Sequence, residues 1–219
     1  MYILHSSPDS AALIVRLVLE DLGVPYEARL IDRAAGQLDS LGYRMLQPLG
    51  KIPALETADG PMFETAAIVL FLSEKHGALA PRPSDPDRAA FLTWLFFAAT
   101  NIDPMVYRAF YPDRVAGPAA SPAVVAHAGP LLRQFFTILD QMVAKDHPTF
   151  LSTEPSVLGY YLAVHLRWLA GFAPGHPARM TSAEFPALHA ICAALETRPA
   201  ALACASAEAL GPTLFTNPV

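Results

Sequence analysis

Three serines lie just before the first predicted helix of the chain, where hydroxyl groups can hold an anion. Ser6, Ser7 and Ser10 follow a short apolar segment and precede an amphipathic one. The start of a helix offers backbone N–H groups without partners and the positive end of the helix dipole. A serine hydroxyl at this place can donate to a bound anion or cap the helix, and the sequence leaves both roles open for Ser10.

A second helix start carries a carboxylate and a hydroxyl side by side. Glu64 and Thr65 precede an apolar segment that predicts a helix from Thr65 to His76. The free N–H groups of its first turn, together with the Thr65 hydroxyl, suit a ligand carboxylate, and Glu64 suits an ammonium group. The alternative is that Thr65 only caps its helix.

The third set of residues with possible chemistry lies around Pro53. Proline is the residue for which a cis peptide bond costs little. A cis bond between Ile52 and Pro53 would turn the N–H and C=O of Ile52 outward at the end of a sheet, where a peptide can add like a strand. Lys51 is placed to meet a carboxylate of such a peptide. The alternatives are an ordinary turn proline and a solvated surface lysine.

Hydrophobic periodicity predicts that an α/β unit positions these residues. Its order is β-α-β-α-β-β-α over residues 1–77, with residues 32–50 read as an irregular helix or loop. The other predicted elements are strand Met1–His5, a helix from Ser10 to Gly23, strand Tyr26–Ile31, strand Ile52–Glu56, strand Met62–Phe63 and helix Thr65–His76.

Residues 78–86 predict a stiff linker because they are rich in proline. Beyond it no strand alternation is evident, so residues 87–219 are expected to form an all-helical domain. Gly117–Pro122 and Gly171–Pro177 are rich in helix breakers and are expected to be loops. The predicted helices are Asp87–Thr100, Pro130–Lys145, Ser156–Ala170, Phe185–Glu196 and Pro199–Glu208.

Composition excludes several classes of protein. The 219 residues are 53% hydrophobic and 16% charged, which argues against disorder. A net charge of -5 without a basic cluster argues against nucleic acid as a partner. The longest uncharged apolar run that we identify, Thr65–Ser73, is too short for a bilayer, and no secretory signal is evident. With only Cys192 and Cys204, and no Cys/His spacing for a metal, we expect a cytoplasmic protein without disulfides.

Two motifs carry a resemblance to a known family. They read Gln47-Pro48-Leu49-Gly50-Lys51-Ile52-Pro53-Ala54-Leu55 and Phe63-Glu64-Thr65-Ala66-Ala67-Ile68. Together they resemble the glutathione-binding half of cytosolic glutathione transferases, and the similarity extends over nearly the whole chain. The resemblance implies a thioredoxin-like domain followed by a helical one, with glutathione as co-substrate, no metal, and a homodimer.

The resemblance also implies roles for the residues of these motifs. In that family the backbone at the Ile52 position, next to the proline that corresponds to Pro53, holds the cysteinyl part of glutathione. Glu64 and Thr65 would then bind the ammonium and carboxylate of the γ-glutamyl part, and Lys51 a carboxylate of the tripeptide.

The thiol of glutathione must become a thiolate before it is a good nucleophile. We expect Ser10 to stabilise this thiolate, with Ser7 as the second choice. The stretch His5–Ala12 resembles the bacterial beta-class pattern, but the cysteine of that class falls on Ala11 here. A mixed disulfide with glutathione is therefore not expected at this position.

The electrophile site is expected in the helical part. Tyr107-Arg108-Ala109-Phe110-Tyr111-Pro112 resembles the beta-class segment His-Lys-x-Phe-x-Pro, which lines that site. The resemblance thus implies Tyr107, Arg108, Tyr111 and Trp168 as electrophile-binding residues, whereas we expect Phe110 in the core. Asn101 or Asp103 would either reach the glutathione bound by a partner subunit or cap a helix end.

The predicted function is transfer of the glutathione thiolate to a hydrophobic electrophile. Two alternatives remain open: another glutathione-dependent activity, such as that of an isomerase, dehalogenase or peroxidase, and a non-catalytic binding or regulatory protein with the same fold.

Overall fold

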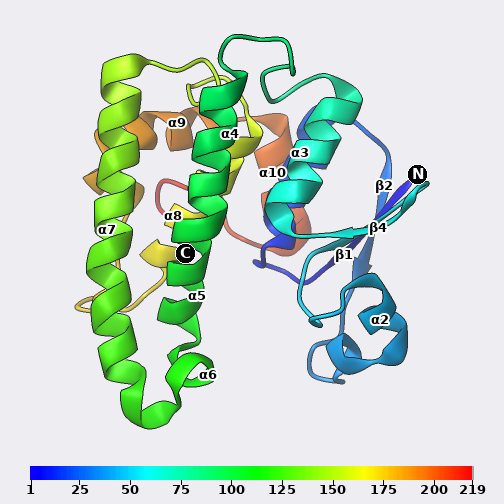
Figure 1. Cartoon of the computed structure of the whole chain (residues 1–219), viewed down its shortest axis with the longest axis horizontal. Helices are drawn as coiled ribbons and strands as arrows, with labels where there is room; N and C mark the ends of the chain where they lie inside the picture. Colours follow the sequence, from blue (N-terminus) through cyan, green and yellow to red (C-terminus); the bar gives the residue numbers. More distant parts are fainter. Residues whose placement is uncertain (219) are drawn as a thin grey trace.

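The computed structural model describes residues 1–218, and it contains a four-stranded sheet followed by a helical region (Figure 1). The strand order is β2-β1-β3-β4, with β1 parallel to β2 and the other two pairings antiparallel. The parallel β1–α1–β2 unit and the antiparallel β3–β4 hairpin confirm the predicted thioredoxin-like arrangement. The strands are β1 (Tyr2–Ser6), β2 (Tyr26–Leu30), β3 (Ala54–Thr57) and β4 (Gly60–Phe63).

Helices α1 (Ala12–Leu22) and α3 (Thr65–His76) cover the sheet, and α1 also packs against the helical region. The apolar side chains of α1, among them Leu13 and Leu17, are fully buried, which explains why this segment folds as a helix here. Both helices end at a glycine in the left-handed conformation, Gly23 and Gly77. The segment predicted as an irregular helix or loop holds a 3₁₀ turn (Gln37–Asp39) and α2 (Leu41–Leu46).

The second region is helical, as predicted. In Figure 1, α4 and α5 follow one another as a long helix beside α7. The α-helices of this region are α4 (Arg88–Phe97), α5 (Asp103–Phe110), α6 (Pro112–Ala116), α7 (Ser121–Asp146), α8 (Val157–Ala170), α9 (Pro186–Glu196) and α10 (Pro199–Glu208). Short 3₁₀ turns lie at Pro118–Ala120 and Ser182–Glu184. The division into domains at residues 77 and 87 stays a prediction.

The start of α7 differs from the prediction, which placed it at Pro130 after a loop. The helix begins at Ser121, with Pro122 in the first turn, where no backbone N–H is needed. Pro130 lies inside the helix and removes one of its hydrogen bonds. Burial of the neighbouring Ala128, Gly129 and Leu132 offsets that loss, so packing decides the helix against the local sequence signal.

Helices α4 and α5 are joined by a π-helical turn, Ala98–Ile102, and together form one stretch, Arg88–Phe110. The stretch is 23 residues long, and an 18-residue window within it has a mean hydropathy of 1.3, so by length and composition it could cross a membrane. Its uncharged part, residues 89–102, is longer than Thr65–Ser73, the run identified from the sequence. The core helix of a folded protein has the same properties. Phe91, Leu95 and Ile102 of this stretch are buried in the core.

Charged contacts fix α1 to the helical region. The carboxylate of Asp21 accepts hydrogen bonds from Arg198 Nη2 (2.7 Å) and Tyr160 Oη (2.9 Å). Arg16 Nη1 donates to Glu208 Oε1 at 3.2 Å, and the Glu208 side chain is 3% exposed. Burial and the neighbouring Asp21 carboxylate raise the pKa of Tyr160, so its phenol keeps the proton that it donates. The sheet and the helices are therefore held at a defined distance.

Candidate functional site

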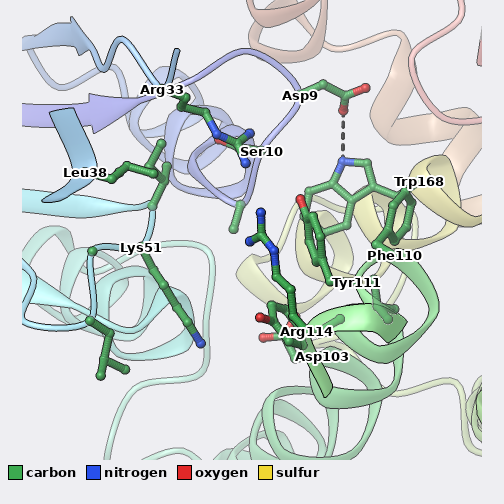
Figure 2. A pocket seen from close by; sticks show the side chains of 16 residues that line it. Asp9, Ser10, Arg33, Leu38, Lys51, Asp103, Phe110, Tyr111, Arg114 and Trp168 are labelled. Carbon is green, nitrogen blue, oxygen red and sulfur yellow. Dashed lines mark hydrogen bonds between the residues drawn. The ribbon is translucent and has the colours of Figure 1, made fainter. Parts of the chain in front are cut away.

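A cavity of about 420 Å³ lies between the sheet region and the helical region (Figure 2). This volume is typical of a site for a small molecule. The sheet region lines it with Asp9, Ser10, Ala11, Arg33, Leu38, Leu49, Gly50, Lys51 and Ile52. The helical region lines it with Asp103, Val106, Tyr107, Phe110, Tyr111, Arg114 and Trp168.

Ser10 lines the cavity just before α1, whereas Ser7 is buried and does not. The Ser10 hydroxyl donates to the Ser7 carbonyl (2.6 Å) and accepts from the backbone N–H of Ala12 (3.3 Å). Within residues 1–218 the backbone N–H groups of Ser10 and Ala11 have no partner. The start of α1 thus presents two free N–H donors at the cavity, and the hydroxyl can join them only by leaving the Ser7 carbonyl.

Asp9 fixes this loop to the helical region, a role that the sequence analysis missed. Its carboxylate accepts from Arg167 Nε (3.0 Å), Arg167 Nη2 (3.1 Å) and Trp168 Nε1 (2.9 Å), the last drawn in Figure 2. Its backbone N–H donates to Glu208 Oε2 at 2.9 Å. Asp9 has a φ of 48°, a left-handed conformation that aspartate tolerates better than most residues. Both Asp9 and Trp168 line the cavity, so this clamp shapes its wall.

Ile52 lines the cavity with an unpaired backbone. The Ile52–Pro53 peptide bond is cis, and neither the N–H nor the C=O of Ile52 is paired with another residue between 1 and 218. The loop before it is fixed by Tyr43, whose hydroxyl donates to the Lys51 carbonyl at 2.6 Å. Burial raises the pKa of Tyr43 to about 12, so the phenol stays protonated at neutral pH. Ile52 therefore offers a donor and an acceptor on a rigid support.

Lys51 lies on the same wall of the cavity. Its backbone N–H donates to Gln47 Oε1 at 3.2 Å, and Gln47 also accepts from Leu49 N–H at 2.7 Å. The Lys51 ammonium lies 5.1 Å from the centre of the Tyr107 ring, a cation–π contact that reaches across to the helical region.

Glu64 and Thr65 lie at the start of α3 and are not among the residues that line the cavity. Glu64 is exposed and has a φ of 70°, whereas Thr65 is buried. No side chain caps α3, so the first-turn N–H groups have no side-chain acceptor within the described chain. Glu64 lies near enough to Tyr161 to help raise the pKa of that phenol, after burial and Asp103.

Aromatic side chains form the opposite wall. The rings of Tyr107 and Tyr111 lie 5.1 Å apart, and Trp168 closes one end. Phe110, expected in the core, is 40% exposed, lines the cavity and packs on Phe172 with ring centres 4.4 Å apart. The core expectation failed because Phe110 lines the cavity, whereas the buried residues of α5 are Val106 and Ala109.

The cation on this wall is Arg114. Arg108, proposed for the electrophile site, does not line the cavity, and its Nη1 donates to the Pro104 carbonyl at 3.0 Å. Arg114, in α6, lines it, with its guanidinium 4.6 Å from the centre of the Tyr111 ring. The resemblance did not extend beyond Pro112, and the only local signal for Arg114 was its position one helical turn beyond Tyr111.

Asp103 lies in the cavity wall and contacts His165. The two ring nitrogens of His165 face two acceptors: the Tyr161 carbonyl (2.6 Å from Nδ1) and Asp103 Oδ1 (2.5 Å from Nε2). Tyr161 also donates to Asp103, so this carboxyl group is occupied within its own chain. Asn101 donates to the Phe97 carbonyl, and contact of either residue with a partner subunit stays a prediction.

Comparison with known proteins identifies the fold. Residues 10–75 match the family model for the N-terminal domain of glutathione S-transferase. A solved sphingomonad glutathione S-transferase, complexed with glutathione, is 27% identical with a TM-score of 0.76, covering 95% of this chain and all of that one. The chain has the glutathione transferase fold.

Two curated relatives named as glutathione S-transferases or similar proteins resemble this chain. The glutathione S-transferase-like protein OpS6 of Beauveria bassiana is 29% identical over 203 residues, with 89% of each chain covered. Glutathione S-transferase 3 of Schizosaccharomyces pombe is 31% identical over 116 residues, which is 52% of this chain and 47% of that protein. The match thus covers less than half of the second relative.

Within this glutathione transferase fold the two cysteines are remote from nucleophilic chemistry. Burial raises the pKa of the Cys192 thiol to about 12, and that of Cys204 is also raised, chiefly by burial. Thiols in this state stay protonated and react slowly. Among residues 1–218 no three His, Cys, Asp or Glu side chains are grouped to hold a metal ion.

Proposed function

We propose that this protein binds glutathione in the cavity and transfers the glutathione thiolate to an electrophile. One observation carries the proposal: the unpaired backbone of Ile52 and the two free N–H groups before α1 line the same cavity. The first pair of groups suits the backbone of a peptide, and the second suits an anion such as a thiolate. The aromatic wall opposite offers space for a second, apolar reactant.

The roles of Ile52 and Lys51 rest on their place in the cavity wall and on the family resemblance, and those of Glu64 and Thr65 rest on the resemblance and on their place at the start of α3. Ile52, held by the turn at Pro53, would pair with the backbone of the cysteinyl residue. Lys51 would meet a carboxylate of the tripeptide. Glu64 would bind the ammonium group of the γ-glutamyl part, and Thr65, with the free N–H groups of the first turn of α3, its carboxylate.

Transfer of the thiolate requires that the pKa of the glutathione thiol is lowered and that the electrophile is bound next to the sulfur. Lowering a thiol pKa by about two units from about 8.5 takes roughly 2.7 kcal/mol of preferential stabilisation of the thiolate. The N–H groups of Ser10 and Ala11, the helix dipole and one hydroxyl are the donors at hand. In a substitution, a C–S bond forms, the leaving group departs with its electron pair, and the thiol proton passes to solvent.

Calorimetric titration with reduced glutathione tests the binding half of this proposal, and turnover of a chloronitroaromatic compound tests the transfer half. We expect saturable binding with a Kd between about 0.1 and 1 mM. Absence of binding at about 10 mM glutathione would contradict the proposed site. Binding without turnover would favour the non-catalytic alternative, and one observation points that way: the Ser10 hydroxyl is donated to the Ser7 carbonyl.

Glu64→Gln is expected to weaken glutathione binding about tenfold, because it removes the charge that pairs with the γ-glutamyl ammonium but keeps the size of the side chain. The same titration measures the effect. Glu74→Gln is the control, since Glu74 lies in the same helix and pairs with Arg88 instead of a ligand. Unchanged affinity in Glu64→Gln would show that this carboxylate does not bind the ammonium.

Ser10→Ala is expected to raise the pKa of bound glutathione by about one unit, because one donor to the thiolate is lost. The ultraviolet absorbance of the thiolate, followed against pH, measures it. Ser7→Ala is the comparison, since Ser7 is buried beneath the loop and does not line the cavity. If neither variant changes the thiol pKa, the N–H groups of Ser10 and Ala11 activate the thiol without a hydroxyl.

We propose a homodimer from the resemblance and a cytoplasmic location from the low cysteine content.

A further inference from the structure

We propose that the electrophile is an acidic aromatic compound whose carboxylate pairs with Arg114. This inference rests on the proposed function and specifies its second substrate. The Arg114 guanidinium is exposed to solvent in the free protein, and an acidic electrophile would give it a charged partner that a purely apolar one cannot supply.

Arg114 is held in place without an anionic partner. It extends from α6 into the space between the two walls, beside Tyr111 (Figure 2). Its guanidinium lies over the Tyr111 ring, 4.6 Å from the ring centre. Within residues 1–218 Arg114 makes no ion pair, and its side chain donates no hydrogen bond. A stacked guanidinium has lost part of its freedom already and keeps its N–H fork free for a carboxylate.

The charges around the cavity leave a positive excess. Arg33, Lys51 and Arg114 line it, against the carboxyl groups of Asp9 and Asp103. Both acids are already partnered from outside the cavity: Asp9 with Arg167, and Asp103 with His165. Within residues 1–218 none of the three cations forms an ion pair with either acid. Arg33, Lys51 and Arg114 are exposed to solvent, so all three are accessible to negative charge on the bound reactants.

The position of Arg114 assigns it to the second substrate. Arg33 and Lys51 come from the sheet region, the wall on which we place glutathione, so they can meet the carboxylate at the free end of the tripeptide. Arg114 comes from the opposite, helical wall, together with Phe110 and Tyr111. A flat ring held against these aromatic side chains would bring a carboxylate at its edge to the guanidinium.

The alternative role for Arg114 is to stabilise charge that develops on the ring of any electrophile during the reaction. The two roles predict different substrate dependence. If Arg114 pairs with a carboxylate, it favours a charged substrate over a neutral one of the same shape. If Arg114 stabilises developing charge, it accelerates the reaction of both substrates.

The test uses two electrophiles of nearly equal shape, 4-chloro-3-nitrobenzoate and 4-chloro-3-nitrobenzamide. Each enzymatic kcat/KM is divided by the rate constant of the uncatalysed reaction with glutathione, which removes the difference in intrinsic reactivity. We expect the ratio to favour the benzoate about tenfold and the preference to shrink in about 0.5 M salt. Calorimetry with the two corresponding glutathione conjugates measures the same preference without turnover.

Arg114→Gln is expected to abolish the preference, with about a tenfold loss for the benzoate and less than a twofold change for the benzamide. Lys145→Gln removes the same unit of charge from an exposed site at the end of α7 and should keep the preference. Arg108→Gln tests the other arginine of this segment, to which the family resemblance points. We expect this variant to keep the preference, because Arg114 lines the cavity and Arg108 does not.

Three results would overturn the inference. Equal loss for both electrophiles in Arg114→Gln would assign Arg114 to developing charge. Loss of the preference in Arg108→Gln but not in Arg114→Gln would assign the carboxylate to Arg108. Wild-type protein that turns over or binds both compounds equally would refute the acidic substrate and leave the proposed transferase function intact. Only a protein that binds neither glutathione nor either conjugate would refute both.

Discussion

Replacing Asp9 by alanine is expected to lower the free energy of unfolding by about 3 kcal/mol, because it leaves a buried charge without its partner. The Arg167 side chain is 5% exposed and donates two hydrogen bonds to the Asp9 carboxylate. The Trp168 indole N–H loses its acceptor as well. The Asp9 side chain is 38% exposed, so solvent screens the pair and the estimate stays at the lower end for a buried ion pair.

Urea unfolding measures this loss, and Asp39→Ala is the matched control. Asp39 pairs with Arg44, but its side chain is 76% exposed, so its removal should cost less than about 0.5 kcal/mol. Asp9→Asn separates charge from shape, since asparagine tolerates the left-handed backbone and keeps one acceptor. If Asp9→Ala is as stable as Asp39→Ala, the clamp does not hold the two regions together.

Gly129→Ala is the second large effect, with an expected loss of at least about 3 kcal/mol. A Cβ at Gly129 would lie 2.4 Å from the carbonyl oxygen and 2.6 Å from the carbonyl carbon of Pro177, both backbone atoms that cannot rotate away. The loop that would have to move also carries Phe172, which supports Phe110 in the cavity wall. Thermal and urea unfolding should therefore show lower stability together with a changed affinity for the electrophile.

Gly42→Ala provides the comparison for this substitution. Gly42 lies in α2 with nothing within 4 Å of an added Cβ, and alanine is the better helix former. We expect it to stabilise the protein by about 0.5 kcal/mol. Equal effects of the two substitutions would mean that the loop at Pro177 moves freely and that α7 does not depend on the close approach at Gly129.

Local signals were sufficient for most of the fold. The sheet region was predictable because each strand and helix has its own periodicity and its own stop, as with Gly23 after α1 and Gly77 after α3. The start of α7 was not predictable from the sequence. Pro130 is a local signal for a helix start, and only tertiary packing around Gly129 keeps the helix continuous through it. Helices α5 and α6 were also missed, since prolines at 104 and 112 read as breakers although each lies in a first turn.

In the candidate site too, residues within local motifs were predictable and residues that depend on distant contacts were not. Ser10, Lys51 and Ile52 could be picked out because short motifs hold them, and the structure places all three at one cavity. Asp9 and Arg114 could not, since their importance comes from residues far along the chain or on the opposite wall. Pairing between Asp9 and Arg167 joins positions that are 158 residues apart, and no local pattern encodes such a contact.

The π-helical turn Ala98–Ile102 sets the phase between the two halves of the long helix. Relative to an α-helix it accommodates one extra residue, and each residue of an α-helix turns the chain by about 100°. Deleting one residue from this turn would rotate Tyr107 and Phe110 by about that angle relative to α4, without changing any side chain of the cavity. Changes of length here, instead of substitutions, therefore offer a route by which such a wall could acquire a different specificity.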